Sequence, residues 1–198
     1  APVGSRFLGV ITQSMSQEFE ATRLSGMRIR LAALAIFSLI VWSSHALLYE
    51  EFIFPDRAYA TPYRLAQLVH CVGLLWLASR RKWEIRAVER GAVFLIAGLM
   101  PIHGLAMLVV RDEVVVPFLL TMEWSQPVVA LAMLMSFSSA SVLFGVTWSV
   151  GVAVVLLRPG FDADLTDHAV LALVYGVVAL SIRNHHQLRI REFLTRHE

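Results

Sequence analysis

Apolar residues along the chain fall into six long runs, separated by short stretches rich in charged and turn-forming residues. A helix of about 20 apolar residues crosses the hydrocarbon core of a bilayer, and each run has roughly that length. The pattern therefore predicts an all-α polytopic membrane protein built as a six-transmembrane-helix bundle. The predicted spans are residues 29–49, 62–80, 90–110, 115–136, 140–157 and 167–184.

The fourth and fifth predicted spans share one apolar tract that is too long for a single crossing. A cluster of serines at 136–141 is the most polar point of this tract. Serine favours turns and helix N-termini over helix interiors. We therefore expect the chain to turn within this cluster.

The segments outside the spans also have a helical pattern. In the N-terminal segment 1–28, residues 15–28 have the pattern of apolar and polar positions that is typical of an amphipathic helix. We expect this helix to lie on the inner membrane surface. The C-terminal segment 185–198 has strong helix formers and no Gly or Pro. It is expected to be a cytoplasmic extension of the last span toward an output domain, or else a basic tail that anchors that span. His185 and His186 are expected to be solvated.

Positive charges are distributed unequally over the two faces that six spans define. Thirteen Lys and Arg residues fall in the termini and the even-numbered loops, against four on the opposite face. Loops rich in Lys and Arg stay in the cytoplasm. The distribution predicts a multi-pass membrane protein with both termini cytoplasmic.

Composition narrows the function classes. Hydrophobic residues make up 57% of the chain and charged residues 16%, which fits a protein whose main partner is the lipid bilayer. Cys71 is the only cysteine, so an intrachain disulfide and a cysteine-rich metal site are both excluded. Neither a nucleic-acid-binding pattern nor a known catalytic motif is recognisable.

Histidines in the predicted spans are the strongest functional signal. His45, His70, His103 and His168 lie on four different spans, all in the predicted outer half of the membrane. Ionisable groups within a membrane are costly and usually functional, although any one of these could be a packing residue. Imidazoles from facing helices suit haem iron or another transition metal, copper included. Haem b bound by two histidines fits this set best, and His70 and His103 match most closely in predicted depth.

The sequence also indicates how many haems could bind and which residues would surround them. One haem b is expected, or two if His45 and His168 form a second pair. Arg57, Arg64 and Arg111 lie at the outer surface, where haem propionates would emerge, but ordinary interfacial anchoring explains them equally well. Gly73 and Gly104 lie next to the histidines and leave room for a flat ring, or else for close helix packing.

A polar group in the fourth span suggests a second kind of site. Glu123, Trp124 and Gln126 lie in its outer half. An intramembrane carboxylate suits proton uptake or a hydrogen bond to a quinone headgroup. Alternatively, the span begins later and Glu123 faces interfacial water.

The predicted layout resembles a known family. Its features are six spans with both ends inside, histidines on spans one, two, three and six, and a helix that leaves span six. It is similar to the six-helix membrane anchors of bacterial class III adenylate cyclases, especially the redox-coupled subgroup compared with the dihaem cytochrome b anchors of succinate dehydrogenase. It is also similar to six-helix quorum-sensing receptor kinases. This resemblance covers nearly the whole chain and rests on layout and histidine placement.

The resemblance implies a sensory domain of the bacterial inner membrane that relays the redox state of the quinone pool, or a lipophilic signal, to a cytoplasmic output domain. It makes His45, His70, His103 and His168 the axial ligands of haem, and it implies a homodimer whose output is an adenylate cyclase or a kinase. One departure is that dihaem anchors place their haems toward opposite membrane faces, whereas these four histidines share one half.

Two other functions remain open. A receptor for a small lipophilic signal would need no cofactor, and its histidines and Glu123 would hydrogen-bond the ligand. A small transporter or membrane enzyme is less well supported, because corresponding halves of the chain show no pair of broken helices.

Overall fold

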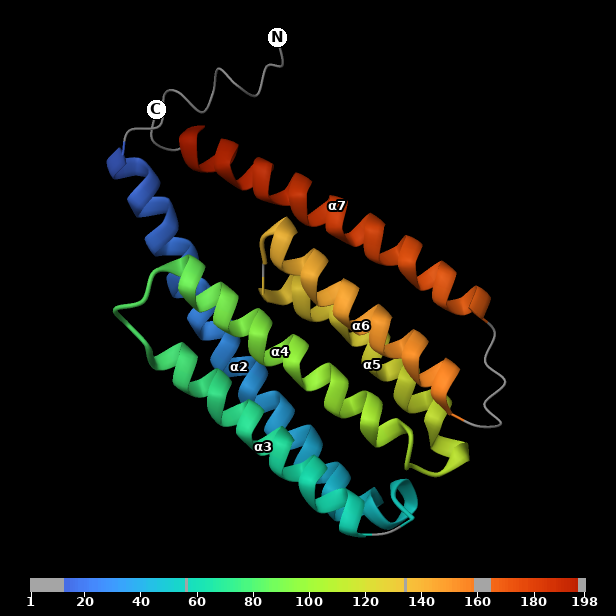
Figure 1. Ribbon diagram of the computed structural model, residues 1–198. Helices are drawn as coiled ribbons and strands as arrows, with labels where there is room; N and C mark the ends of the chain where they lie inside the picture. Colours follow the sequence, from blue (N-terminus) through green and yellow to red (C-terminus); the bar gives the residue numbers. More distant parts are fainter. Residues whose placement is uncertain (1–12, 56, 134, 159–164, 196–198) are drawn as a thin grey trace.

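The computed structural model describes residues 13–55, 57–133, 135–158 and 165–195, and every regular element in this part of the chain is a helix (Figure 1). The predicted all-α class is therefore confirmed. The helices are α2 (Gln13–Ile53), α3 (Arg57–Ser79), α4 (Ile85–Met107), α5 (Asp112–Met133), α6 (Phe137–Leu157) and α7 (Leu165–Thr195).

Within the described residues, four helices are long and apolar enough to cross a membrane: α2 over Gln17–Ser44, and α4, α5 and α6 over their whole lengths. Large apolar side chains cover their outer surfaces, as a lipid environment allows; Phe94 is 78% exposed and Leu105 66%. The predicted spans 62–80 and 167–184 fall in α3 and α7, which are not among the four helices found in the described residues.

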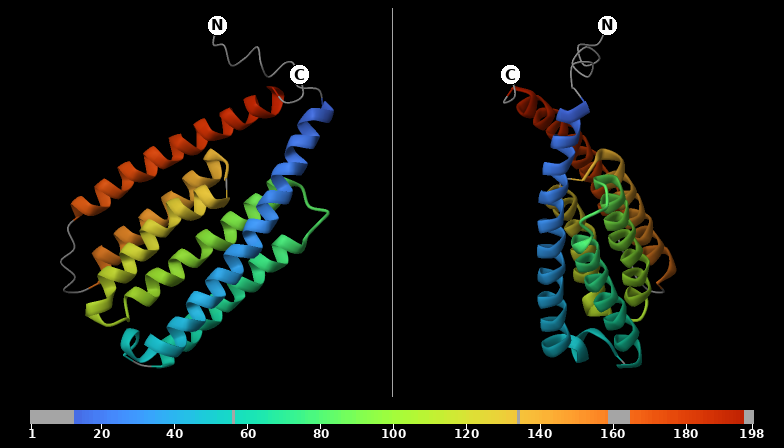
Figure 2. Two further views of the ribbon diagram at one scale, coloured as in Figure 1. Left: turned by 180° about the vertical axis from the view of Figure 1, so that it is seen from behind. Right: turned by 90° about the vertical axis from the view of Figure 1, so that its left-hand side faces the viewer.

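Helix α4 lies in the middle of the bundle. It packs against α3 on one side and against α6 on the other, while α2 packs along α3 and α7 along α6. Figures 1 and 2 show α2 and α3 at one side of the molecule and α7 at the other. Helix α2 begins and α7 ends at the same end of the bundle, which is called the terminal end below.

Glycines allow the central helices to approach one another. A Cβ atom on Gly73 would lie 3.0 Å from a Leu95 methyl group, and one on Gly104 would lie 2.6 Å from a Val150 methyl group. Both glycines are therefore occupied by helix packing. They do not hold open a slot for a flat ring.

The amphipathic segment 15–28 is not a separate surface helix, because α2 runs without a break from Gln13 to Ile53. Met27 is 1% exposed and belongs to the core. Arg28 donates hydrogen bonds to the carbonyls of Arg80, at 2.6 Å, and Trp83, at 3.3 Å, in the connection between α3 and α4. The first turns of α2 are thus part of the bundle.

The predicted turn at the serine cluster is confirmed for its first residue only, because Ser136 lies in the turn and the later serines of the cluster belong to α6. Helix α5 ends at Met133 and α6 begins at Phe137, with Ser136 as the N-cap residue that accepts a hydrogen bond from the Ser139 amide at 3.3 Å. At the other end of the chain, α7 continues as one helix to Thr195, beyond the expected end of the span at 184.

Candidate functional site

A cavity of about 470 Å³ lies between α2, α3, α4 and α5. Apolar and aromatic side chains form most of its wall. The polar side chains that reach it come from all four helices: Ser38, Arg64, Gln67, His70, His103, Thr121, Ser125 and Gln126. Such a site, mainly apolar with a few polar groups, is typical of small-molecule pockets.

Two of the four predicted histidines line this cavity, and both are held in the same way. His70 Nδ1 lies 3.1 Å from the carbonyl oxygen of Leu95, and His103 Nδ1 lies 2.9 Å from that of Leu99. A carbonyl only accepts, so each ring carries its hydrogen on Nδ1 and a lone pair on Nε2. The two carbonyls are one helical turn apart on α4, about 6 Å. The cavity therefore receives two neighbouring acceptor nitrogens.

Aromatic rings surround these two imidazoles. The Trp42 ring lies 5.6 Å from the His70 ring and 6.4 Å from the His103 ring, between centroids. Tyr63 meets His103 edge to face at 5.4 Å, and Phe118 stacks on it at 5.9 Å. The aromatic contacts fix both rings in place. These three aromatic residues were not among the residues predicted from the sequence.

A polar stripe on α3 leads to His70. Tyr63, Gln67 and His70 are spaced four and three residues apart, which places them on one helix face, and all three are buried. Arg64 donates hydrogen bonds to Gln67 Oε1, at 2.9 Å, and to the Trp42 carbonyl, at 3.4 Å. Arg64 therefore braces the cavity wall. The spacing of the stripe was a signal that could have identified Gln67.

His168 lies elsewhere, beside Glu123. Its Nε2 atom is 3.3 Å from Glu123 Oε1, and both side chains are buried, at 6% and 2% exposure. Tyr175 donates its hydroxyl to the Glu123 carbonyl at 2.7 Å, and Gly151 of α6 lies against both members of the pair. The structure thus separates His168 from His70 and His103, and joins it to the predicted proton or quinone residue.

The other predicted residues have different surroundings. Gln126 lines the cavity and donates to the Met122 carbonyl at 3.1 Å, whereas Trp124 is 48% exposed on the outside of α5. Arg111 is exposed. The side chains of His45 and Arg57 lie outside the described residues.

The histidines of the cavity can be judged by the ligands that a metal ion or a haem iron needs. Among the described residues no group of three or more His, Cys, Asp or Glu side chains converges. Haem supplies four nitrogens of its own and needs at most two axial ligands, and metal-bound histidines typically donate their other N–H to a carbonyl, as His70 and His103 do. Their chemistry fits one haem b, but the ring has no slot beside Gly73 or Gly104.

Comparison of the chain with protein-family models, with curated proteins and with solved structures finds no match. Family membership therefore stays a prediction from the layout of the sequence.

Proposed function

We propose that the chain is a membrane sensory domain whose central cavity binds a small lipophilic ligand through His70 and His103. The observation that carries this proposal is the pair of imidazoles, both with Nδ1 tied to a carbonyl, in one apolar cavity of about 470 Å³. Known ligand pockets span about 300–1,000 Å³. Because both Nε2 atoms are acceptors, the preferred ligand carries a hydroxyl donor, as a quinol does.

Haem b is a second candidate, favoured by the tautomer that both rings share. In that case His70 and His103 would hold the iron, Arg64 at the cavity wall would face a propionate, and the bound haem would supply one-electron chemistry. A second haem is less favoured, because His168 is paired with Glu123 at 3.3 Å.

The signal would pass across the bundle to α7. Helix α4 carries His103 and both carbonyls, α6 packs against α4, and α7 packs against α6. Because α7 is one helix of 31 residues, a shift at its membrane part would move its last turns. We propose that these turns lead to a cytoplasmic output domain, such as an adenylate cyclase or a kinase, in a homodimer. The unequal distribution of Lys and Arg supports six spans with both termini in the cytoplasm.

If the cavity binds a quinol, the bound ligand should quench the fluorescence of Trp42. A short-chain ubiquinol analogue, titrated into the detergent-purified protein, should bind with an affinity that falls about three- to tenfold in His70→Ala or His103→Ala, because each variant loses one hydrogen bond. His185→Ala, remote from the cavity, is the control, and Trp42→Phe should remove the signal. Equal affinities in wild type and both histidine variants would rule the site out.

If His70 and His103 bind haem b, the purified protein should absorb visible light. Absorption spectra of the oxidised and dithionite-reduced protein, expressed with added haem precursor, should show the sharp reduced bands of a six-coordinate b-type haem, and His70→Ala or His103→Ala should abolish them. A colourless protein would exclude haem and leave the quinol reading in place.

A further inference from the structure

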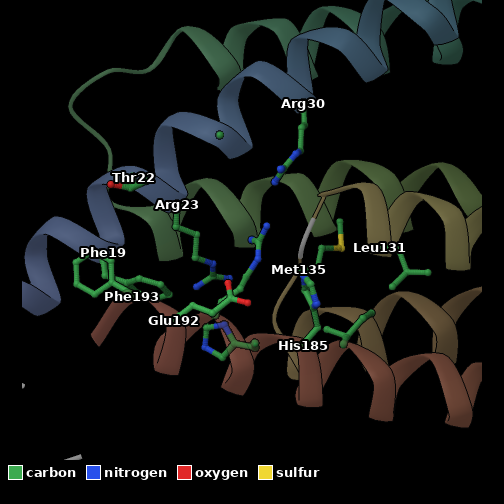
Figure 3. A pocket seen from close by; sticks show the side chains of 13 residues that line it. Phe19, Thr22, Arg23, Arg30, Leu131, Met135, His185, Glu192 and Phe193 are labelled. Atoms are coloured by element: carbon green, nitrogen blue, oxygen red, sulfur yellow. The ribbon is translucent and has the colours of Figure 1, made fainter. Parts of the chain in front are cut away.

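A second cavity, of about 380 Å³, lies at the terminal end of the bundle, between the first turns of α2 and the last turns of α7. In Figure 3, Arg23 and Arg30 from α2 and His185 and Glu192 from α7 extend into the same space. The cavity is remote from His70 and His103, and the function proposed above makes no use of it.

The cavity wall carries an excess of positive charge. Arg23, Arg30 and Arg189 line it, against one carboxylate, that of Glu192. Arg23 is paired with Glu89 at 2.9 Å, whereas neither Arg30 nor Arg189 forms an ion pair within the part of the chain that the structure describes. Two guanidinium groups thus remain to bind an anion.

Burial and the neighbouring positive charges both disfavour the protonated forms of two side chains at this cavity. Burial, then Arg30 and Arg23, lower the pKa of Arg189, while Glu192 raises it. Burial, then Arg23, also lower the pKa of His186, which contacts the cavity from α7. A bound anion would relieve both effects, because it stabilises the protonated forms.

Apolar groups close the cavity on its membrane side and at one end. Leu131 and Met135, from the end of α5 and the residues after it, form the wall toward the membrane together with Ile182. Phe19 and Phe193 pack at 5.3 Å between ring centroids and close the opposite end (Figure 3). The basic side chains therefore lie between two apolar ends of the cavity, and the wall offers an acyl chain apolar contacts beside the charged groups.

We propose that this cavity binds a phosphate group, held by Arg30 and Arg189, and that an anionic phospholipid is the source that its apolar wall favours. Guanidinium groups bind phosphate oxygens with charge-assisted hydrogen bonds. Because one arginine comes from α2 and the other from α7, the bound phosphate ties the last turns of α7 to the bundle. The lipid then sets how freely those turns move.

The experiment measures binding of a phosphatidylglycerol with a fluorescent tail to the detergent-purified protein. Arg30→Gln and Arg189→Gln should each raise the dissociation constant about tenfold. Glu192→Gln should lower it, because Glu192 supplies the one carboxylate among the described residues that line the wall. Arg189→Lys should recover part of the loss. The matched control is Arg81→Gln, an exposed arginine in the α3–α4 connection at the same end.

Competition distinguishes the two sources of the phosphate group. Displacement by unlabelled phosphatidylglycerol but not by phosphatidylcholine or inorganic phosphate supports the lipid, and displacement by millimolar inorganic phosphate supports a free phosphate compound at the same site. The proposal is overturned if Arg81→Gln weakens binding as much as Arg189→Gln, or if none of the variants changes it. Equal helical content of all variants shows that the differences do not come from misfolding.

Discussion

Replacing Gly151 by alanine is expected to lower the midpoint of thermal unfolding by roughly 5 °C or more. The new Cβ atom would overlap Glu123 Oε1 and lie 3.3 Å from His168 Nε2. Glu123 is 2% exposed and cannot move to solvent, so the methyl group must separate the buried pair or push α6 away from α5 and α7. Overpacking of this kind costs about 1–3 kcal/mol, and separating a buried acid from its partner adds to that.

The same helix provides the control. A Cβ atom on Gly145 would meet nothing within 4 Å, and alanine is the better helix former by about 1 kcal/mol. Gly145→Ala should therefore leave the midpoint unchanged or raise it, when both variants are melted in one detergent and followed by circular dichroism. If the two variants melt alike, the Glu123–His168 pair is not packed as described.

Hydropathy was sufficient to predict the helices. A helix that crosses a bilayer needs about 20 mainly apolar residues, and a few polar residues within such a run do not hide the pattern. The serine cluster was equally informative, since Ser136 caps α6 as the composition indicated. The continuity of α2 was not predictable in this way. Residues 15–28 are amphipathic because they pack on the bundle, and the same pattern would arise from contact with a membrane surface.

The histidines show why depth alone does not define a site. His70, His103 and His168 share a predicted half of the membrane, yet His168 is directed toward Glu123 of α5, where Gly151 of α6 also packs. Depth fixes the position along a helix axis, whereas partners depend on the direction around the axis and on which helices are neighbours. The spacing of Tyr63, Gln67 and His70 places them on one face of α3, and this spacing indicates the direction in which His70 points.

Glu89 is the clearest residue that the sequence analysis missed. It lies just outside the predicted span 90–110 among charged neighbours, so it resembled the solvated end of a helix. Because α4 begins at Ile85, Glu89 is instead 5% exposed inside the bundle. One carboxylate oxygen accepts from Arg23 of α2 at 2.9 Å, and the other accepts from the Ser136 amide at 2.5 Å, where α6 begins. Three parts of the fold meet at this side chain.

Glu89→Ala should accordingly be the most destabilising single change considered, lowering the unfolding midpoint by about 10 °C. It leaves the Arg23 guanidinium, only 16% exposed, without its carboxylate, and it leaves the Ser136 amide without an acceptor. Removing one member of a buried ion pair costs about 3–5 kcal/mol, which for a chain of this size corresponds to a shift of that order. The measurement is again thermal unfolding by circular dichroism.

Companion variants separate the two contributions of Glu89. Glu89→Gln keeps an oxygen for the Ser136 amide but loses the charge opposite Arg23, so its midpoint should lie between those of wild type and Glu89→Ala. Adding Arg23→Ala to Glu89→Ala should recover stability, because no unpaired charge then remains. Glu84→Ala removes an exposed carboxylate that makes no capping hydrogen bond at the start of α4, and it should melt like the wild type. A double variant less stable than Glu89→Ala would show that Arg23 stabilises the bundle through contacts other than this ion pair.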